Sequence, residues 1–324
     1  SPRSAGKTYE EAVGGRWKMD TPMPEGVKNL IVKNVNEVEE VASTVDFVFS
    51  AVDMTKDEIR AIEEEYAKTE TPVVSNNSAH RWTKDVPMVV PEINAAHFDL
   101  IKTQKERLGT TRGFIAVKPN CSIQSYTPAL AAWKEFGPKE VVVTTYQAIS
   151  GAGKTFKDWP EMIENIIPYI GGEEEKSEKE PLRVLGTLEN GEIKLAEEPK
   201  ITCQCLRVPV LNGHTAAVFV KFRKKPTKEQ LIEALRNFKG LPQELELPSA
   251  PKHFIQYLEE DNRPQVSEDV NYENGMGVSI GRLREDKVYD YKFVGLSHNT
   301  VRGAAGGAVL CAETLKAKGY ITKK

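Results

Sequence analysis

The sequence predicts an α/β protein of two domains, a parallel sheet covered by helices and, after it, an α+β domain. The first part of the chain alternates short apolar runs with amphipathic helix patterns, which is typical of a parallel sheet with helices on its faces. Beyond residue 121 several strand patterns follow one another with few helices between them, which indicates a mixed or antiparallel sheet. The 324 residues are enough for both domains and a large core.

The first domain contains several short apolar runs. They predict strands at residues 30–35, 45–52, 72–75 and 88–90, and a short helix at 36–42. Thr55 and Glu58 form a capping box, in which each side chain accepts a hydrogen bond from the amide of the other residue. Ile59, Ile62 and Tyr66 then share one face of the helix that this box opens. A parallel sheet of this kind binds ligands beyond the carboxyl ends of its strands.

The stretch from Lys118 to Ser122 joins a buried strand pattern at residues 113–117 to a helix pattern. The helix pattern consists of apolar residues at three- and four-residue steps, Ile123, Tyr126, Leu130 and Trp133. We therefore expect Cys121 at a helix N-terminus, where free amides and the dipole can lower the pKa of a thiol to roughly 3.5–7.5 and make it nucleophilic. A buried structural cysteine is the alternative, and Pro128 indicates a kink or a later helix start.

The second domain is richer in strands. Its strand patterns cover residues 140–147, 203–210, 215–223, 278–284 and 289–295. Thr227 and Gln230 form a second capping box, and Gly240 closes the helix that it opens. A last helix is expected from a cap at Asn299 or Thr300 to about residue 318. Small residues at 303–308 allow another backbone, or a cofactor, to approach its start closely.

The composition excludes several classes of protein. A net charge of -3 provides no basic face for nucleic acid, and no apolar run approaches the roughly 18 residues of a membrane span. Four cysteines without an opening signal peptide indicate a reducing compartment, so we expect a cytoplasmic protein. Cys203 and Cys205 point to the same side of a strand, but no second Cys or His pair stands at ligand spacing, so no metal is expected.

Arg207 and His214 are the other candidates for chemistry. An arginine within a strand is costly to bury without a partner, and it can hold a substrate carboxylate with two hydrogen bonds. A lone histidine is more often structural, but it can transfer protons near neutral pH. Together with Cys121, His214 provides the minimum for acyl transfer through a thiol.

Six segments carry a resemblance to a known family: Arg3–Lys7, Ser75–Ser78, Pro119–Ser122, Gln147–Gly153, Arg207–His214 and His298–Ala305. In this order and spacing they resemble aspartate-semialdehyde dehydrogenase over essentially the whole sequence. The resemblance implies a dinucleotide-binding (Rossmann-like) domain at 1–120 and 300–324. It also implies a catalytic and dimerisation domain of the glyceraldehyde-3-phosphate-dehydrogenase-like type at 121–299, and a homodimer or homotetramer.

Enzymes of this family reduce L-aspartyl 4-phosphate with NADPH to L-aspartate 4-semialdehyde and phosphate, on the way to lysine, methionine and threonine. The resemblance implies that Cys121 forms a thioester, that His214 is general acid and base, and that Gln147 holds the intermediate. It implies that Arg207 binds the α-carboxylate and Glu173 the ammonium group. For the phosphate it implies a set of three residues, Asn120, Arg81 and Lys176.

The cofactor implied is NADP. The family's glycine-rich phosphate loop is not in this sequence, so a leading strand–helix–strand unit of roughly 35–40 residues is expected to be missing and the first domain to be N-terminally incomplete. The residues that the resemblance assigns to the cofactor are Arg3, Ser4 and Lys7 for the 2′-phosphate, Ser50 and Ala51 at a strand end, and Ser150, Gly151 and Asn299 near the nicotinamide.

Two kinds of alternative remain open at this point. One is a related reductase of the N-acetylglutamyl-phosphate or malonyl-CoA type, which would share the cysteine and the histidine but bind a different acyl group. The other is a non-catalytic relative that keeps the fold as a scaffold. Cys121, Gln147, Arg207 and His214 are all present in the sequence, which argues against the scaffold.

Overall fold

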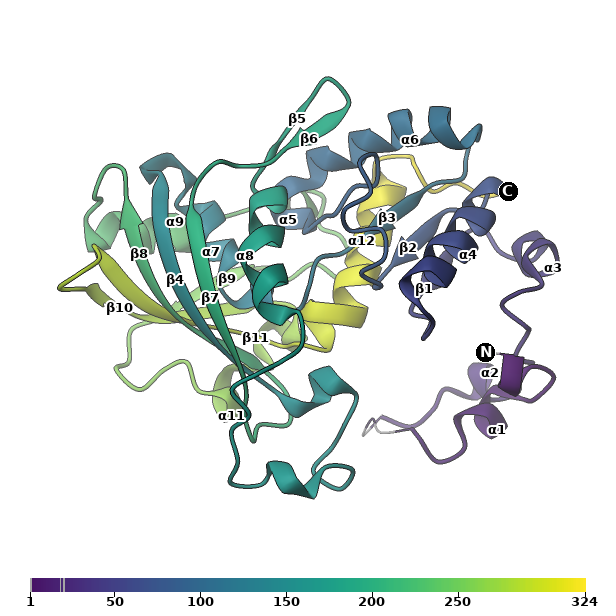
Figure 1. Cartoon of the computed structure of the whole chain (residues 1–324), viewed down its shortest axis with the longest axis horizontal. Helices are drawn as coiled ribbons and strands as arrows, with labels where there is room; N and C mark the ends of the chain where they lie inside the picture. Colours follow the sequence, from purple (N-terminus) through teal and green to yellow (C-terminus); the bar gives the residue numbers. More distant parts are fainter. Residues whose placement is uncertain (1, 18, 20) are drawn as a thin grey trace.

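Two sheets organise the computed structural model, which describes residues 2–17, 19 and 21–324 (Figure 1). The first sheet is parallel, in the order β1 (Val48–Ser50), β2 (Val73–Ser75) and β3 (Ile115–Val117). The second has six strands in the order β7-β4-β8-β11-β10-β9 and mixes parallel with antiparallel pairs. The expected succession of an α/β domain and a mixed-sheet domain is confirmed. Residue 1, where the first domain was expected to begin, lies outside the described residues.

The second sheet contains every strand expected for it and one more. Its strands are β4 (Pro138–Gln147), β7 (Lys200–Arg207), β8 (His214–Phe222), β9 (Ile255–Leu258), β10 (Val278–Glu285) and β11 (Tyr291–Ser297). The edge strand β9 and a separate hairpin, β5 (Thr187–Glu189) with β6 (Glu192–Lys194), were not predicted. Both are short: β9 has four residues, and the strands of the hairpin alternate polar and apolar residues over only three positions each, on either side of Asn190 and Gly191.

Twelve α-helices are present in the described residues. They are α1 (Tyr9–Val13), α2 (Glu25–Lys28), α3 (Val38–Ser43), α4 (Lys56–Lys68), α5 (Pro91–Asn94), α6 (Leu100–Leu108), α7 (Thr127–Ala132), α8 (Glu173–Val184), α9 (Lys228–Asn237), α10 (Leu241–Glu244), α11 (Val266–Asp269) and α12 (Gly306–Ala317). Within the described part of the chain, none of them combines the length and apolar composition needed to cross a bilayer.

Both predicted capping boxes are confirmed. The Thr55 hydroxyl accepts a hydrogen bond from the amide of Glu58 at 3.3 Å, and the Glu58 carboxylate accepts one from the amide of Thr55 at 2.9 Å. Thr227 and Gln230 make the same pair of bonds at the start of α9. The apolar stripe of α4 is buried as expected, so sequence and packing agree on where this helix begins and which face it hides.

The strand expected at residues 30–35 is wrong. Ile31 forms only an isolated bridge with Thr8, and the side chains of Leu30 and Ile31 are 58% and 59% exposed. An apolar run becomes a buried strand only where neighbouring strands and a covering layer remove it from water, and this segment pairs with residues 6–9 alone among those described. The strand expected at 45–52 is present but limited to Val48–Ser50.

The run at residues 88–90 is buried but is not a strand. Met88 makes a single bridge to Val117, and prolines stand on both sides at positions 87 and 91. Because proline offers no amide to a ladder, the run cannot extend the sheet. Asn94 instead satisfies its backbone: the Asn94 side chain accepts from the amide of Val90 at 2.8 Å and donates to the carbonyl of Met88 at 2.9 Å.

The start of the last helix also differs from the prediction. Neither Asn299 nor Thr300 caps it, and a π-helical turn, η8 (Val301–Ala305), precedes α12. The ring nitrogen Nδ1 of His298 instead lies 3.3 Å and 3.2 Å from the amides of Thr300 and Val301 and accepts from them. The Asn299 side chain is therefore free to bond elsewhere, in the site described below. The far end agrees with the prediction to within one residue.

The register of the second sheet brings three candidate residues to one edge. β4 and β7 run parallel with Gln147 opposite Arg207, so both strands end there. β8 runs antiparallel to β4 and begins at His214, at the same edge. β11 ends at Ser297, directly opposite His214. Strand pairing alone thus places Gln147, Arg207 and His214 side by side.

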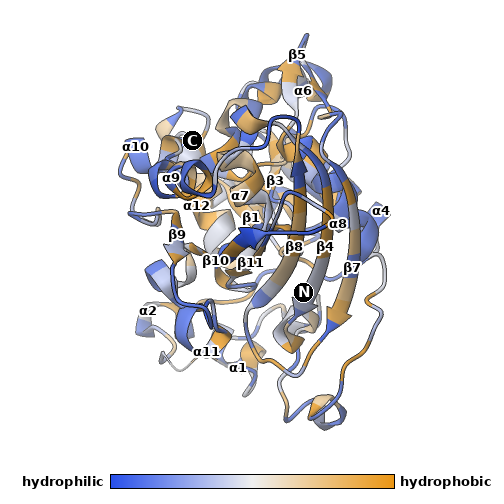
Figure 2. Ribbon diagram, turned by 90° about the vertical axis from the view of Figure 1, so that its left-hand side faces the viewer, coloured by the Kyte–Doolittle hydropathy of each residue, from blue (hydrophilic) through white to orange (hydrophobic). Residues whose placement is uncertain are grey.

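One face of this sheet packs on the helices and the other does not. Trp133, at the end of α7, stacks edge-to-face on Phe293 of β11 with centroids 5.0 Å apart, inside the main core. Helix α8 packs against β7 on the same side. Figure 2 shows β8, β4 and β7 from the opposite side, with no helix across them. Tyr146 of β4 is 36% exposed there, so this face is available to a partner.

A buried ion pair ties the last helix to the first domain. Both Nη atoms of Arg302 donate to the carboxylate of Glu92, its Nε donates to the carbonyl of Met276 at 2.8 Å, and its guanidinium lies 4.6 Å from the ring centroid of Phe254. The side chains of Arg302 and Glu92 are 1% and 0% exposed. Removing one member of such a pair leaves an uncompensated charge in the interior.

We expect Glu92→Gln to lower the free energy of unfolding by about 3–5 kcal/mol, because Arg302 would lose its counter-charge without gaining access to water. Urea denaturation followed by circular dichroism measures the change. The matched control is Glu285→Gln, which breaks the pair with Lys225 on the surface, where the side chains are 71% and 49% exposed, and should change stability by less than about 1 kcal/mol. Equal effects in the two variants would contradict this account.

Candidate active site

Cys121 lies at the carboxyl end of the first sheet, in the loop that follows β3. The residue after it opens a single 3₁₀ turn, η3 (Ser122–Ser125), and α7 begins only at Thr127. Pro128 is the second residue of α7, where a missing amide costs nothing. The α-helix expected directly after Cys121 thus begins later, which is the alternative that Pro128 indicated, and the site lacks the dipole of a long helix behind the thiol.

The sulfur of Cys121 contacts His214. Its Sγ lies 3.3 Å from Nε2 of the imidazole, and the amide of Ala148 donates to Nδ1 of the same ring at 3.0 Å. A backbone amide can only donate, so Nδ1 carries no proton and the neutral ring holds its proton on Nε2, facing the sulfur. Burial, followed by the charge of Arg207, lowers the pKa of His214 to about 3. The imidazole is thus a neutral hydrogen-bond donor to Cys121.

The thiol is not acidified in the way that the sequence suggested. Cys121 is half-buried, and desolvation followed by the nearby Glu173 raises the pKa of its thiol, while Lys118 and Arg81 act in the opposite direction. The resting residue is therefore a neutral thiol. Because a short 3₁₀ turn replaces the expected helix, neighbouring cations are the groups that favour its ionised form.

Glu173 collects three of the predicted residues around its carboxylate. One oxygen accepts from Asn120 Nδ2 at 3.0 Å and from Lys176 Nζ at 2.8 Å, and the other accepts from Gln147 Nε2 at 3.1 Å. Burial raises the pKa of Glu173, but Lys176 and these amides more than offset it, so the pKa is lowered. A carboxylate that stays ionised in a buried position can bind a cationic group of a ligand.

Arg207 faces the same space from the end of β7. Its Nη1 donates to the carbonyl of Ala148 at 2.6 Å, which orients the guanidinium toward His214. A Cβ added to Gly151 would lie 3.1 Å from that Nη1 and 3.5 Å from Nε2 of His214. Glycine at position 151 therefore leaves open the space beside both groups.

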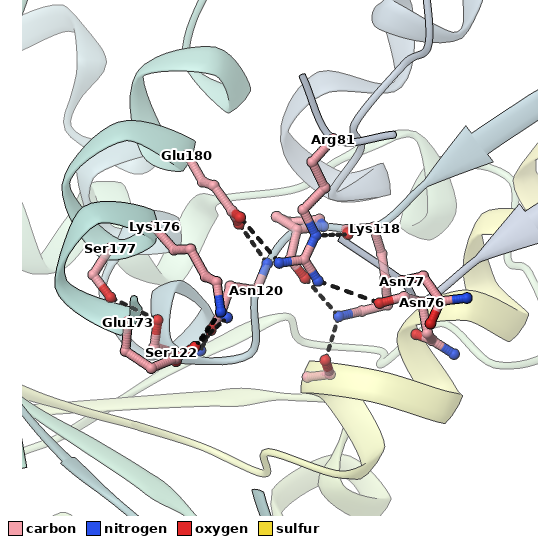
Figure 3. Close-up of polar contacts among 12 residues, drawn as sticks. Asn76, Asn77, Arg81, Lys118, Asn120, Ser122, Glu173, Lys176, Ser177 and Glu180 are labelled. Carbon is pink, nitrogen blue, oxygen red and sulfur yellow. Dashed lines mark hydrogen bonds and ion pairs between the residues drawn. The ribbon is translucent and has the colours of Figure 1, made fainter. Parts of the chain in front are cut away.

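Arg81 and Asn120 are brought together by a residue that sequence reasoning missed. Glu180 accepts from Nη1 of Arg81 at 3.0 Å and from the amide of Asn120 at 2.5 Å (Figure 3). Its side chain is 1% exposed. The signal was available: Glu173, Ser177 and Glu180 are spaced by four and three residues, so they share one face of α8. The surrounding run of charges concealed it.

Ser177, in the middle of that face, contacts the nucleophile loop as well. Its hydroxyl lies 2.8 Å from that of Ser122, and its carbonyl accepts from the hydroxyl of Tyr126 at 2.5 Å. Helix α8 thus holds the loop of Cys121 at three successive points. Behind it, Cys203 and Cys205 are buried and free, with sulfurs 3.7 Å apart. No cluster of three or more potential metal ligands occurs among residues 2–17, 19 and 21–324.

The residues predicted for a cofactor fall into three separate places. Asn299 donates to the hydroxyl of Ser150 at 2.8 Å and accepts from the amide of Gly213, so it links the loop after β4 to the turn before His214. Ser50 ends β1 and accepts from Asn77 at 3.0 Å, and Ala51 beside it is exposed. The third place, residues 3–7, lies away from these. Its backbone bonds internally, from Lys7 to Ser4, and to Val32. Arg3 and Lys7 are exposed, and Ser4 is half-buried.

The chain is similar to known proteins along nearly its whole length. Residues 1–101 match the family described as semialdehyde dehydrogenase, NAD binding domain, and residues 129–302 match the semialdehyde dehydrogenase dimerisation domain. An aspartate-semialdehyde dehydrogenase from Methanothermobacter thermautotrophicus is 42% identical over 318 residues, which cover 97% of this chain and 89% of that protein. One from Aspergillus fumigatus is 40% identical over 99% of this chain and 89% of its own.

Solved structures agree. A crystal structure of aspartate semialdehyde dehydrogenase with NADP from Candida albicans is 37% identical in sequence and superposes with a TM-score of 0.85. The match covers 99% of this chain and 90% of that one.

Proposed function

The chain belongs to the aspartate-semialdehyde dehydrogenase family, and from that premise we propose how its own residues carry out the family's reaction. The enzyme is an NADP-dependent oxidoreductase that converts L-aspartyl 4-phosphate to L-aspartate 4-semialdehyde and phosphate. The observation that carries the proposal for the site is the contact of 3.3 Å between Cys121 Sγ and His214 Nε2, with Arg207 and Glu173 opening onto the same space.

Cys121 is the nucleophile of this mechanism. Its sulfur attacks the acyl carbon, a C–S bond forms, and the bond from that carbon to the phosphate oxygen breaks. The thiol proton leaves with the phosphate, so the step yields a thioester on Cys121 and hydrogen phosphate. Bound NADPH supplies the hydride that reduces the acyl carbon. Breaking of the C–S bond then releases the aldehyde and returns the sulfur as thiolate.

His214 takes the part of a proton-bearing donor. Its Nε2–H stabilises negative charge on the sulfur and on oxygen atoms that develop charge beside it, as a neutral imidazole does where an amide holds the other ring nitrogen. The expected role as general acid is compatible with this geometry. The role as general base would require an unprotonated Nε2, which the bond from Ala148 disfavours.

Substrate recognition divides between the two ends of the ligand. We assign the α-carboxylate to Arg207, whose remaining N–H groups are not used by Ala148, and the ammonium group to the ionised Glu173. The phosphate falls to Arg81, Asn120 and Lys176, which lie along α8 and its neighbouring loops. Gln147 donates to Glu173 and is placed to hold the acyl intermediate.

The residues around the carboxyl ends of β1 and β2 fit a nicotinamide. The side-chain oxygen of Asn76 is buried without a hydrogen-bond partner, which suits the amide of that ring. Ser50 ends β1 and Ala51 follows it, while Asn299 bonds to Ser150 and Gly151 lies beside His214 in the other domain. We assign the 2′-phosphate to the charges of Arg3 and Lys7 with Ser4.

The organisation of the whole enzyme follows the same logic. We propose that residues 1–120 and 300–324 form the cofactor domain, since α12 packs in one apolar cluster with β2 and β3, and that 121–299 form the catalytic and dimerisation domain. The uncovered sheet face supports a homodimer or homotetramer. A cytoplasmic location suits four free cysteines and a phosphorylated substrate.

The experiment that tests this function compares three aldehydes with NADP and phosphate: the semialdehydes of aspartate, N-acetylglutamate and malonate. We expect kcat/KM for aspartate semialdehyde to exceed the others by at least about 10³-fold, because a ligand without an ammonium group makes no ion pair with the ionised Glu173. Preference for either of the other two would assign the chain to that reductase type. No turnover of any of them by the folded protein would favour the scaffold.

A further inference from the structure

The thiolate formed in this mechanism needs a counter-charge, and apart from Lys118 the charged groups around the sulfur are each bonded to a carboxylate or assigned to the substrate. His214 stays neutral because the amide of Ala148 occupies Nδ1. Lys176 is committed to Glu173 at 2.8 Å, and Arg81 to Glu180 at 3.0 Å. Arg207 is assigned to the substrate's own carboxylate. A sulfur anion in a half-buried site is costly unless a cation lies near it.

Lys118 is a cation in the right place, three residues before Cys121. It is 3% exposed, and its ammonium donates to the carbonyl of Pro119 at 2.8 Å and to the carbonyl of Gly303 (Figure 3). Among the residues that the structure describes, no carboxylate forms an ion pair with it. Burying an ammonium group on carbonyls alone costs free energy, and such a cost is commonly tolerated where the charge serves a function.

Gly303 connects this ammonium to the sulfur. A Cβ on Gly303 would lie 2.6 Å from Cβ of Cys121, so the backbone of the last helix rests directly against the nucleophile. The carbonyl of the same residue accepts from Lys118. A Cβ added to Gly307 would lie 3.1 Å from Cε of Lys118, so glycine at position 307 leaves room for the aliphatic part of the lysine side chain. The backbone of Gly303 thus contacts both Lys118 and Cys121.

We propose that Lys118 is a positioning residue whose buried charge balances the Cys121 thiolate and whose hydrogen bond to Gly303 holds the last helix against the nucleophile. The proposal deepens the function given above and rests on it for the need of a thiolate. In agreement, the pKa of Lys118 is lowered to about 8, first by burial and then by Arg81, while Cys121 acts to raise it.

Other titratable groups around the pair are accounted for. Those that face Lys118 or Cys121 from the packed elements are Arg81, Glu173, Glu180, Arg207, His214 and Cys311. Burial raises the pKa of the Cys311 thiol to about 12, so it stays neutral, and Glu180 is bonded to Arg81 and Asn120. Lys118 and Cys121 are therefore the two groups whose charges depend on one another, and they titrate as a coupled pair.

The test measures alkylation of Cys121 by iodoacetamide from pH 6 to 10, read on the Cys121 peptide by mass spectrometry. Lys118→Met removes the charge and the donor, and Lys118→Gln removes the charge but keeps an N–H donor. In both we expect the midpoint to rise by about one pH unit, so alkylation at pH 7.5 slows about tenfold. In the wild type, coupling to Lys118 should broaden the dependence of the alkylation rate on pH. In the two variants this dependence should follow the titration of a single group.

The matched control is Lys56→Gln. Lys56 is exposed on α4 and lines the same cleft as Arg81 and Glu180. Its substitution therefore removes an exposed positive charge near the site and leaves the buried charge of Lys118 in place. Its alkylation profile should superpose on the wild type. A shift as large as that of Lys118→Gln would mean a general charge effect and would overturn the proposal.

Thermal melting separates this role from a structural one. A buried cation that serves the thiol costs stability, so Lys118→Gln should melt at or above the wild-type temperature. A wild-type alkylation profile in both lysine variants, or loss of folding in both, would overturn the proposal. Alkylation requires neither cofactor nor substrate, so a protein that failed as a dehydrogenase would still give a readable result here.

Discussion

Replacing Cys121 by alanine is expected to lower kcat by about 10⁵–10⁶-fold, which is the effect of removing the nucleophile from an enzyme that works through a covalent intermediate. Without the sulfur no thioester forms, and water cannot substitute for it, because hydrolysis of the acyl phosphate gives no aldehyde. Phosphate-dependent reduction of NADP by aspartate semialdehyde measures the loss. Rapid mixing with the acyl phosphate should show no thioester burst, while substrate binding by calorimetry is retained.

The matched control for this variant is Cys311→Ala. Cys311 is also free and buried, but it lies on α12 and its thiol donates to the carbonyl of Val89 at 3.6 Å, away from the reacting space. It should keep the wild-type kcat. Turnover within about a hundredfold of the wild type in Cys121→Ala would show that another group performs the acyl transfer.

Substitution of His214 is expected to have the second-largest effect on kcat. His214→Ala should lower kcat by about 10²–10⁴-fold, because the hydrogen-bond donor to the sulfur and to the developing oxyanion is lost. His214→Gln should recover part of the loss, since its amide N–H can replace the Nε2–H of a neutral ring. Steady-state rates of the two variants against the wild type measure the difference.

The pH dependence gives an independent check on this residue. With its pKa lowered to about 3, His214 is neutral throughout pH 5–9. The neutral form is the working donor and is present above that pKa, so kcat/KM should show no inflection near 6.5 from this group. An inflection there that disappears in His214→Gln would show that the imidazole titrates as a base, in contradiction to the bond from Ala148.

Much of the site was predictable because strand pairing is local and periodic. Runs of strand-forming residues predicted β4, β7 and β8, and once these strands pair, Gln147, Arg207 and His214 meet at one end of the sheet. The capping boxes likewise located α4 and α9 from four residues each. These features depend on neighbours in sequence or on adjacent strands, which the sequence displays directly.

The parts that could not be predicted depend on what packs above a residue. The expected lowering of the Cys121 pKa assumed an α-helix in contact with water, whereas the structure places a 3₁₀ turn there and covers the thiol. Lys118 has no sequence signal that distinguishes a buried lysine from an exposed one. Glu180 lay in a run of charges of both signs, which usually indicates a solvated surface, although one face of α8 is buried.

The spacing of Glu173 and Glu180 on α8 sets a measure of length. Seven residues are two helical turns, about 10 Å along the axis; one carboxylate is the group we propose for the amino end of the ligand, and the other bonds the arginine proposed for its phosphoryl end. The pitch of a single helix then acts as a ruler against which the acyl chain is gauged. We therefore expect homologues of the substrate with a longer chain to react more slowly, because their phosphoryl group would not coincide with Arg81 while their amino group is held at Glu173.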